Sequence, residues 1–437
     1  MNHLSANGIR CFQRKDGQNV KKEEAKNGTP RGGFLALGSL NSHFREEEKM
    51  PSFRQSKKVI LTCEISLPVK ITGFELRRIA LSLVRPMRTS FGTLADRDVL
   101  LVRAMTENGT EGWGECVAFS APFYSPEYVQ GCAEVIERFF APAILARKET
   151  EAEEVSGLLE GLLGHQMAKA TIETAVLDAQ LKEKGQSFAS YFSASREEVD
   201  CGVSVGIANS IDLLLEEVSS YVEEGYRRVK LKIEPGWDVE PVSAVRSAWP
   251  EIPLQVDANQ AYSLSDAEHL AGLDRFHLLL IEQPLNEHDL LGHADLAKKV
   301  QTPICLDESI TSVADARQAI ALGATKIINI KPGRVGGYLE SVRIHDFCKD
   351  SGIPVWCGGM FETGIGRAAN VALAALPGFT MPGDTSGSSR YFHRDITSPF
   401  VLENGRLKVP QGPGIGVSID RPYLEEITTD IRRIGNV

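Results

Sequence analysis

Short aliphatic runs recur in the second half of the chain, and each run ends at a charged residue. Five of these charged residues follow one another at intervals of 25, 25, 25 and 24 positions: Lys232, Asp257, Glu282, Asp307 and Lys331. An interval of this length accommodates one β-strand and one helix, and alternating strands and helices are typical of a parallel sheet. In (β/α) barrels, functional side chains lie at the C-terminal ends of successive strands. The pattern therefore predicts both a barrel and the place of its site.

The order of the predicted strands fixes which side chains face each other. The strands are expected at residues 201–207, 229–233, 254–257, 279–282, 304–307 and 327–331, with a short last strand near 379–384. The second and sixth positions of an eight-membered ring are opposed, so Lys232 and Lys331 are expected on opposite sides of the barrel mouth, with the three carboxylates between them. Strand residues two apart point to the same face, so Lys230 is expected beside Lys232.

Three carboxylates without a neighbouring histidine or thiolate form an all-oxygen set of ligands. Such a set suits Mg²⁺ or Mn²⁺ and disfavours zinc. A substrate carboxylate on this metal would have its α-proton acidified, and a lysine on each face would act as acid or base. Repulsion between the ammonium groups of Lys230 and Lys232 is expected to lower the pKa of one lysine from about 10.4 to about 8.5.

The chain before the barrel has a different pattern. Alternating or aliphatic strands are expected at residues 74–83, 99–105 and 113–117, and helices at 129–145 and 167–182. These elements predict an α+β segment at 71–195, followed by a (β/α) barrel at 196–395.

The first 70 residues have a separate character, with 13 Lys or Arg and 7 Asp or Glu. Their lack of periodicity and their richness in Gly, Asn, Ser and Lys predict a disordered extension without a role in catalysis. A cleaved targeting peptide is one interpretation, although the clusters at 23–24 and 46–48 are acidic and transit peptides are poor in acids. An extension from an upstream start codon, with Met50 as the true start, is the other.

Composition limits the setting in which the protein works. With 437 residues, 42% of them hydrophobic, the chain can bury a large core and hold more than one domain. Eight cysteines are scattered without a C-x-x-C pair, which predicts free thiols in a reducing cytoplasm. The longest apolar run, near 371–376, is too short to span a bilayer. A net charge of −10 argues against a nucleic-acid partner. We expect a homo-oligomer that acts on a small-molecule carboxylate.

The motifs at the strand ends resemble those of the enolase superfamily, in its muconate-lactonizing-enzyme subgroup. The motifs are K-x-K, D-x-N, E-Q-P, D-E-S and a sixth-strand lysine, found here at residues 230–232, 257–259, 282–284, 307–309 and 331. Within this subgroup the chain is most similar to the o-succinylbenzoate synthase / N-succinylamino acid racemase family. The segments that carry this resemblance are residues 112–116 (GWGEC), 202–206 (GVSVG) and 358–367 (GGMFETGIGR).

The resemblance also implies the domain organisation. The expected fold class is α/β, a modified TIM (β/α)7β-type barrel at 196–395 with an α+β capping domain at 71–195 that is completed by the C-terminal segment 396–437. Residues 88–93 would form a loop that closes over the barrel mouth.

The resemblance implies a role for each residue of the predicted site. Asp257, Glu282 and Asp307 would bind the metal, and Lys232 and Lys331 would be the acid/base pair. The other implied roles belong to residues around these five. Lys230 would contact the substrate carboxylate and tune Lys232, Glu308 would be an outer carboxylate that bonds a lysine or a metal ligand, and further substrate contacts would come from Ser204, Asn259, Gly359 and Met360. For Asn259, a purely turn-forming role after the strand is an equal alternative.

Two reactions are compatible with the implied site. The first is dehydration of 2-succinyl-6-hydroxy-2,4-cyclohexadiene-1-carboxylate to o-succinylbenzoate in menaquinone biosynthesis, which we place first, and the second is racemisation of N-succinyl or other N-acylamino acids. A dipeptide epimerase is disfavoured because the expected D-x-D reads Asp384-Thr385-Ser386. A muconate cycloisomerase is disfavoured by residues 358–367, and a catalytically silent barrel is disfavoured because no ligand or lysine is missing.

Overall fold

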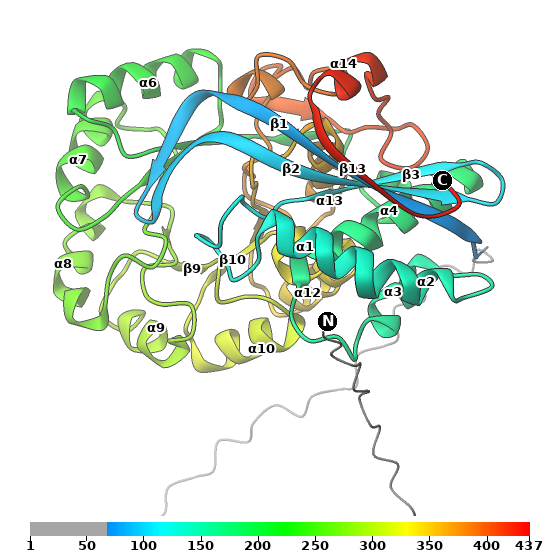
Figure 1. Ribbon diagram of the computed structural model, residues 1–437. Coiled ribbons are helices and arrows are strands. Elements are labelled where there is room, and N and C mark those ends of the chain that lie inside the picture. The colour runs from blue at the N-terminus through cyan, green and yellow to red at the C-terminus, as the bar shows by residue number, and fades with distance from the viewer. Residues whose placement is uncertain (1–67) are drawn as a thin grey trace, which may run out of the picture. The chain divides into compact units, whose positions relative to one another are not determined.

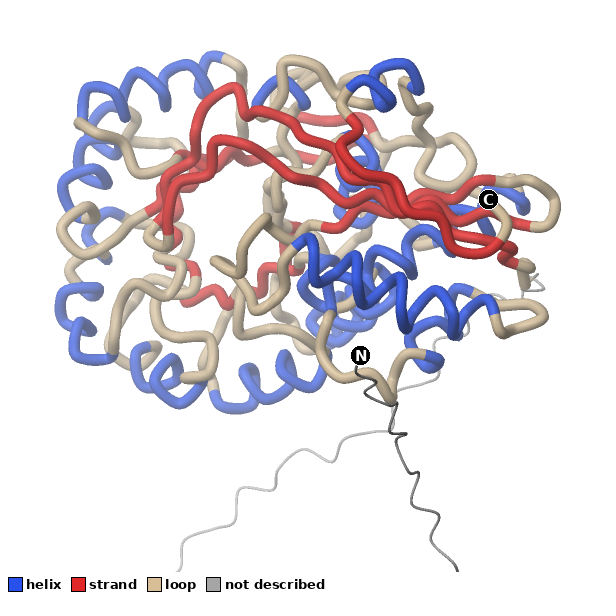
Figure 2. Tube along the Cα trace, in the orientation of Figure 1, coloured by secondary structure: helices blue, strands red, loops and turns tan. Residues whose placement is uncertain are grey.

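The computed structural model describes residues 68–437, so the expectations for the N-terminal extension and for Met50 fall outside the described residues. The chain builds a four-stranded antiparallel sheet, a seven-stranded parallel sheet and a two-stranded sheet. Helices surround the ring of parallel strands, and the antiparallel sheet with its helices lies against this ring (Figures 1 and 2). The predicted fold class, a modified (β/α) barrel with an α+β cap, is confirmed. Within residues 68–437, no helix is long and apolar enough to cross a membrane.

The seven parallel strands pair in the order in which they occur along the chain. They are β5 (Gly202–Val205), β6 (Arg228–Lys232), β7 (Leu254–Asp257), β8 (Ile281–Glu282), β9 (Ile304–Leu306), β10 (Ile327–Ile330) and β11 (Val355–Cys357). The predicted strand at 379–384 does not form as a regular strand. Phe379 and Gly383 instead make isolated parallel bridges to Val355 and Cys201, so this segment links the two edges of the sheet. Gly383 and the prolines at 377 and 382 limit regular pairing there.

Helices follow these strands, and several begin at a residue whose side chain caps the first turn. They are α6 (Ile211–Glu223), α7 (Val239–Ala248), α8 (Ala267–Ala271), α9 (Leu290–Leu296), α10 (Val313–Leu322), α11 (Pro332–Val335), α12 (Tyr338–Asp350) and α13 (Gly364–Ala374). In α6 the hydroxyl of Ser210 accepts a hydrogen bond from Leu213 N, which caps the first turn. Leu214, Val218 and Val222 recur at every fourth position of α6; the first two are buried and Val222 is half-buried.

The antiparallel cap sheet has the order β13-β1-β2-β3. Its strands are β1 (Ile71–Thr89), β2 (Gly92–Thr106), β3 (Glu111–Cys116) and β13 (Thr428–Gly435). The C-terminal β13 pairs with β1, as expected for a chain that returns to the cap. The predicted loop at 88–93 is instead the tight tip of the β1–β2 hairpin, because both strands extend far beyond their predicted ends by pairing with each other. The hairpin crosses from the cap to the barrel mouth (Figure 1).

Helices cover one side of the cap sheet. The predicted helix at 129–145 consists of α1 (Val129–Val135), a π-helical turn at Ile136–Phe140 and α2 (Ala141–Leu145). The smaller elements are α3 (Ala152–Leu158), α5 (Phe188–Tyr191), α14 (Arg421–Glu426) and the pair β4 (Glu198–Asp200) and β12 (Arg406–Lys408). Pro142 lacks an N–H for the helical ladder, and its position near the start of α2 accounts for the irregular turn before it.

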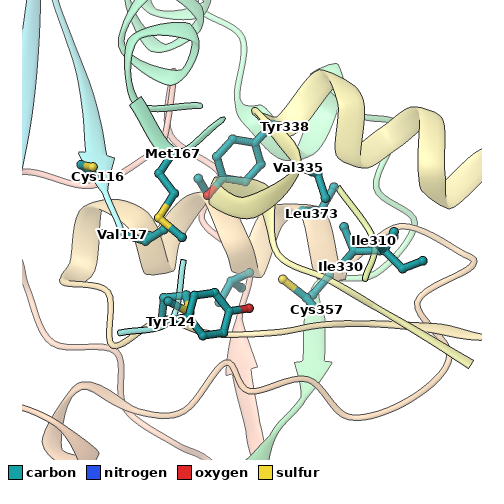
Figure 3. Close-up of a cluster of buried hydrophobic side chains, with 14 of the residues drawn as sticks. Cys116, Val117, Tyr124, Met167, Ile310, Ile330, Val335, Tyr338, Cys357 and Leu373 are labelled. Carbon is teal, nitrogen blue, oxygen red and sulfur yellow. The ribbon is translucent and has the colours of Figure 1, made fainter. Parts of the chain in front are cut away.

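The long helix α4 (Gln166–Lys184) packs between the cap sheet and the barrel. Almost all of its length is buried, because the cap sheet covers one side and the barrel helices α11 and α12 cover another. A Cβ on Gly114 would lie 2.0 Å from the carbonyl oxygen of Thr171, so this glycine lets β3 approach α4 closely. Met167 from α4, Val117 after β3, Val335 and Tyr338 belong to one buried cluster that joins the two parts (Figure 3).

Candidate active site

The register of the barrel sheet aligns the predicted site residues at one end of the strands. Lys232 pairs with Asp257 across β6 and β7, and Asp257 pairs with Glu282 across β7 and β8. Asp307 directly follows β9, and Lys331 directly follows β10. The carboxylates of Asp257, Glu282 and Asp307 are almost completely inaccessible to solvent. The structure therefore brings together the five residues that the spacing singled out.

On one side of the barrel mouth, two lysines share the carboxylates. Lys230 Nζ lies 3.2 Å from Asp257 Oδ2, 3.0 Å from Glu282 Oε2 and 2.7 Å from Asp384 Oδ2. Lys232 Nζ lies 2.6 Å from Asp257 Oδ2 and donates to Asn259 Oδ1 at 2.6 Å. As expected from strand alternation, both lysines project into the same space.

On the opposite side, Lys331 belongs to a second group of charged side chains. Its Nζ lies 2.7 Å from Asp307 Oδ2 and 3.1 Å from the hydroxyl of Tyr124, a residue of the cap. The guanidinium of Arg334 pairs with the same carboxylate and donates to the Tyr124 hydroxyl at 3.3 Å. The ammonium group of Lys331 also sits 4.7 Å from the centre of the Tyr124 ring. Cap and barrel thus both contribute to the surroundings of Lys331.

The expected lowering of a lysine pKa by ammonium repulsion is wrong for Lys230. Burial acts to lower the pKa of Lys230, but the carboxylates of Asp384, Glu282 and Asp257 outweigh burial and hold its pKa above the ordinary value. Burial likewise opposes the charge of Lys331, whereas Tyr124, Glu308 and other acids raise its pKa. The pKa of Lys230 is raised by the carboxylates around it, which the expectation from the neighbouring ammonium group did not include. Lys230 is a cation suited to binding a carboxylate.

The three buried carboxylates have the chemistry of a divalent-cation site. Each of the three carboxylates is paired with a lysine, and in this arrangement no three His, Cys, Asp or Glu side chains of residues 68–437 are already gathered as a metal site. Burial and the adjacent charge of Asp257 raise the pKa of Glu282, which a divalent cation between these acids would oppose. The all-oxygen ligands and their compensating lysines fit a hard cation that displaces ammonium groups.

The predicted substrate contacts line a single cavity. Ser204, Lys230, Asn259, Gly359 and Met360 all border it, together with Lys232 and Lys331, and its volume is about 40 Å³. The Ser204 hydroxyl is buried and has no hydrogen-bond partner among the described residues, so it is available to a ligand. Asn259 has a positive φ of 41°, which fits the turn-forming role, and its side chain accepts a hydrogen bond from Lys232, while its contact with the substrate stays a prediction.

Glu308 lies behind this cavity. Its Oε1 accepts a hydrogen bond from Asn259 Nδ2 at 3.1 Å, and its Oε2 has no partner within the described part of the chain. Burial raises the pKa of Glu308 to about 7. The expected contact of Glu308 with a lysine or metal ligand is therefore indirect, because Asn259 connects Glu308 to Lys232.

Several residues at the site were not predicted. Tyr124 comes from the cap and no periodic pattern marks it, whereas Phe91 lies in the segment 88–93 that was expected to close over the barrel mouth. Asn329 donates to Glu282 Oε1 at 2.8 Å, and its position two residues before Lys331 is a signal that strand alternation could have used. Asp384, which pairs with Lys230, ends the predicted last strand and could have been found in the same way.

The tip of the β1–β2 hairpin covers the barrel mouth. Arg88 Nη2 donates to Glu234 Oε1 at 2.9 Å, and the Arg88 carbonyl accepts from Ile207 N at 2.9 Å. The Ser90 hydroxyl lies 3.3 Å from the carbonyl oxygens of Ala258 and Asn259. These bonds hold Phe91 at the cavity, which is the position expected for a closing element.

Comparison with known proteins identifies the class to which this fold and site belong. Residues 74–191 match the family described as mandelate racemase / muconate lactonizing enzyme, N-terminal domain, and residues 213–423 match the family described as enolase C-terminal domain-like. A crystal structure of an enolase-superfamily member from Listeria innocua is 41% identical, with a TM-score of 0.81, and the match covers 84% of this chain and 99% of that one. The protein is an enzyme of the enolase superfamily.

Individual relatives narrow the family further. An N-succinylamino acid racemase from Amycolatopsis sp. is 58% identical over 369 residues, which cover 84% of this chain and all of the relative. An o-succinylbenzoate synthase from Bacillus subtilis is 47% identical, and the match covers 83% of this chain and 97% of the relative. The chain belongs to the o-succinylbenzoate synthase / N-succinylamino acid racemase family, as its motifs suggested.

Proposed function

We propose that the protein racemises N-succinylamino acids by a two-base mechanism, with o-succinylbenzoate synthesis as its second activity. The observation that carries this proposal is that Lys232 and Lys331, from β6 and from the end of β10, line the same cavity. From the sequence alone, dehydration was expected as the main reaction and racemisation as the alternative. The identity of 58% to a racemase, against 47% to a synthase, favours the alternative order.

In this mechanism each lysine acts on one face of the substrate. Lys230 binds the substrate carboxylate, and Lys232 removes the proton from the α-carbon, whose bonding electrons pass into the carboxylate. Lys331 then delivers a proton to the opposite face, which forms the new C–H bond and inverts the centre. The reverse reaction exchanges the roles of Lys232 and Lys331. A divalent cation, Mg²⁺ or Mn²⁺, bound by Asp257, Glu282 and Asp307 would supply the Lewis acidity that makes the α-proton removable.

The charge balance of the cavity supports an acylated amine rather than a free ammonium group. Among the described residues that border the cavity, Asp384 is the one carboxylate. It is already paired with Lys230 at 2.7 Å and with Arg228 at 2.8 Å, so it has no free charge for a substrate cation. An N-succinyl or other N-acyl group removes that cation from the substrate. The dipeptide epimerase reaction, whose substrate carries a free ammonium group, is therefore disfavoured by the charge of the cavity as well as by the missing second aspartate.

The proposal is tested by following α-deuterium exchange in ²H₂O with each enantiomer of N-succinylphenylalanine. We expect Lys232→Ala and Lys331→Ala both to lose racemisation, while each retains exchange of one enantiomer, a different one for each variant. Lys326→Ala, which changes an exposed lysine, serves as the control. Racemisation that survives either substitution, or exchange of the same enantiomer by both variants, would contradict two-base chemistry.

The second activity is tested with the cyclohexadiene substrate. Chelator-sensitive loss of the diene absorbance in the presence of Mg²⁺ would support dehydration at the same site. Turnover that resists EDTA would contradict the assignment of Asp257, Glu282 and Asp307 as metal ligands.

The cellular location and the oligomeric state of the protein are also part of the proposal. The cysteines in residues 68–437 are all free and buried, which supports a cytoplasmic location. Assembly as a homo-oligomer stays a prediction, and light scattering after size-exclusion chromatography would test it.

A further inference from the structure

A carboxylate of the cap contacts the start of a barrel helix. Glu115, in β3, accepts hydrogen bonds from Thr363 N at 2.9 Å, from the Thr363 hydroxyl at 2.6 Å and from Gly366 N at 2.9 Å. Thr363 is the N-cap residue of α13, which follows the seventh parallel strand. Glu115 therefore ties the edge of the cap sheet to the barrel at a point next to the cavity.

The segment just before this contact forms a wall of the catalytic cavity. Gly359, Met360 and Phe361 border the cavity directly. Phe361 has a φ of 60°, and a non-glycine residue in the left-handed region is strained and persists there only when its surroundings hold it. Met360 N donates to Glu362 Oε2 at 2.9 Å, which bends the segment back on itself. The wall is thus a strained turn that needs an anchor.

The start of α13 offers space and favourable electrostatics for the carboxylate of Glu115, which is the anchor. Its side chain is buried, and its charge lies at the N-terminus of the 11-residue helix α13, where the helix dipole favours an anion. A Cβ on Gly366 would lie 3.0 Å from Glu115 Oε2 and 2.8 Å from Glu362 Cγ, so a glycine is required there. The GWGEC and GGMFETGIGR segments, which are far apart in the sequence, meet at this contact.

We infer that Glu115 is a positioning residue, which holds the cavity wall at residues 359–361 in its binding geometry from the cap. The functional part of this inference rests on the proposed racemisation, because the wall matters for catalysis only if the cavity receives the substrate. Glu115 itself does not border the cavity and acts through Thr363 and Gly366.

The chain offers a matched control for this residue. Glu173, in α4, is also a buried carboxylate of the cap that contacts the start of a barrel helix, since it accepts from Leu339 N at 3.2 Å in α12. The residues before α12, Gly336 and Gly337, do not border the catalytic cavity. Glu173→Gln therefore makes the same chemical change at an equivalent contact without touching the wall.

Amide hydrogen exchange tests the inference without any substrate. We expect Glu115→Gln to speed exchange in residues 357–366 about tenfold relative to the wild-type protein, because an amide nitrogen then faces the N–H of Gly366. Glu173→Gln should leave this segment unchanged. The experiment is done near pH 8, because burial raises the pKa of Glu115 to about 7 and the carboxylate is then ionised. Unchanged exchange at 357–366 in Glu115→Gln would overturn the inference.

Kinetics test the functional consequence. With N-succinylphenylalanine, Glu115→Gln should raise KM about tenfold and change kcat by less than about threefold, because the wall contributes to binding throughout the reaction. Thr363→Val, which loses the hydroxyl, should raise KM as Glu115→Gln does. Thr363→Ser, which keeps the hydroxyl, should have the KM of the wild-type protein. Altered exchange with an unaltered KM would overturn the link to substrate binding. Absence of racemisation in the wild-type protein would contradict the proposed function and leave the exchange result intact.

Discussion

Lys230 and Asp384 form a buried ion pair at the inner wall of the barrel, with Lys230 Nζ 2.7 Å from Asp384 Oδ2. Arg228 binds the other oxygen of the same carboxylate at 2.8 Å, and its guanidinium group lies 5.1 Å from the centre of the Trp356 ring. Two buried cations therefore share one anion, which itself sits at the edge of the cavity. This arrangement couples the stability of the barrel to the charge of the site.

Replacement of Asp384 should expose this coupling. Asp384→Asn leaves Arg228 without its carboxylate partner, and removal of one member of a buried ion pair costs about 3–5 kcal/mol. We expect a comparable loss in the free energy of unfolding, measured by urea denaturation. Asp295→Asn, which removes an exposed pair with Lys298, should leave the free energy of unfolding almost unchanged, because exposed ion pairs contribute little. Equal effects of the two substitutions would show that the Asp384 pairs contribute little.

Replacement of Lys331 by arginine should separate the two reactions. Arginine keeps the positive charge beside Tyr124 and Asp307 but does not give up its proton near neutral pH. Racemisation needs both lysines as acid and base, whereas dehydration can proceed with one lysine as base and then acid while the other stays cationic. We expect Lys331→Arg to lose racemisation at least about a hundredfold more than dehydration. Equal losses of the two activities would contradict this division of roles.

The five spaced residues were predictable because they follow from the strand–helix repeat alone. The interval of about 25 residues sets the place of Asp257, Glu282 and Asp307 on neighbouring strands, and parallel pairing then aligns them. The ends of short strands such as β8 were misjudged, because a two-residue strand has no pattern of its own, and the predicted strand at 379–384 forms only isolated bridges. The strand order of the barrel and the positions of its charged site residues could therefore be predicted from local sequence.

Tyr124 and the hairpin could not be predicted in this way. Tyr124 reaches Lys331 across 207 residues of sequence, and nothing in its own loop indicates that contact. The strands β1 and β2 continue past their hydrophobic runs because they pair with each other and rest on the barrel, which is a tertiary effect. The prediction of a lowered pKa failed for Lys230 for the same reason, because the carboxylate of Asp384, which raises this pKa, comes from the last barrel segment, far away in the sequence.

The buried Glu173 should make stability depend on pH. Burial raises the pKa of Glu173 from an ordinary value of 4.5 to about 8, although backbone N–H groups of α12 oppose the shift. A raised pKa means that its stabilising effect is complete below pH 4.5 and is lost as the pH rises to 8, because the unfolded chain ionises first. Relative to Glu173→Gln, the wild-type protein should lose on the order of 4 kcal/mol across this interval.

Urea denaturation of both proteins at several pH values measures this difference directly. Groups other than Glu173 titrate in both proteins, so their contributions cancel in the comparison. The glutamine variant should equal the wild-type protein at low pH and exceed its stability near pH 8.5. Parallel stability curves would show that Glu173 does not ionise with a raised pKa.

The contact between Arg88 and Glu234 should control access to the cavity. A volume of about 40 Å³ is far below the roughly 300–1,000 Å³ of ligand sites, so the hairpin tip has to open for substrate to enter. Arg88 and Glu234 are partly exposed, with side-chain exposures of 46% and 26%, and such a pair contributes less than about 1 kcal/mol to stability. Glu234→Gln should therefore leave the Tm almost unchanged and loosen the closed hairpin.

A loosened hairpin should change kinetics in a recognisable way. We expect KM to rise about two- to fivefold in Glu234→Gln, with kcat unchanged, or increased if opening limits product release. Salt screens the wild-type pair, so raising the salt concentration should bring the KM of the wild-type protein toward that of the variant, whose own KM should respond less. Glu403→Gln removes an exposed pair with Lys408 and should change neither KM nor its salt dependence. If Glu234→Gln has the same KM and salt dependence as the wild-type protein, the Arg88–Glu234 pair does not govern closure, and the bonds of Ser90 and Ile207 would hold the hairpin alone.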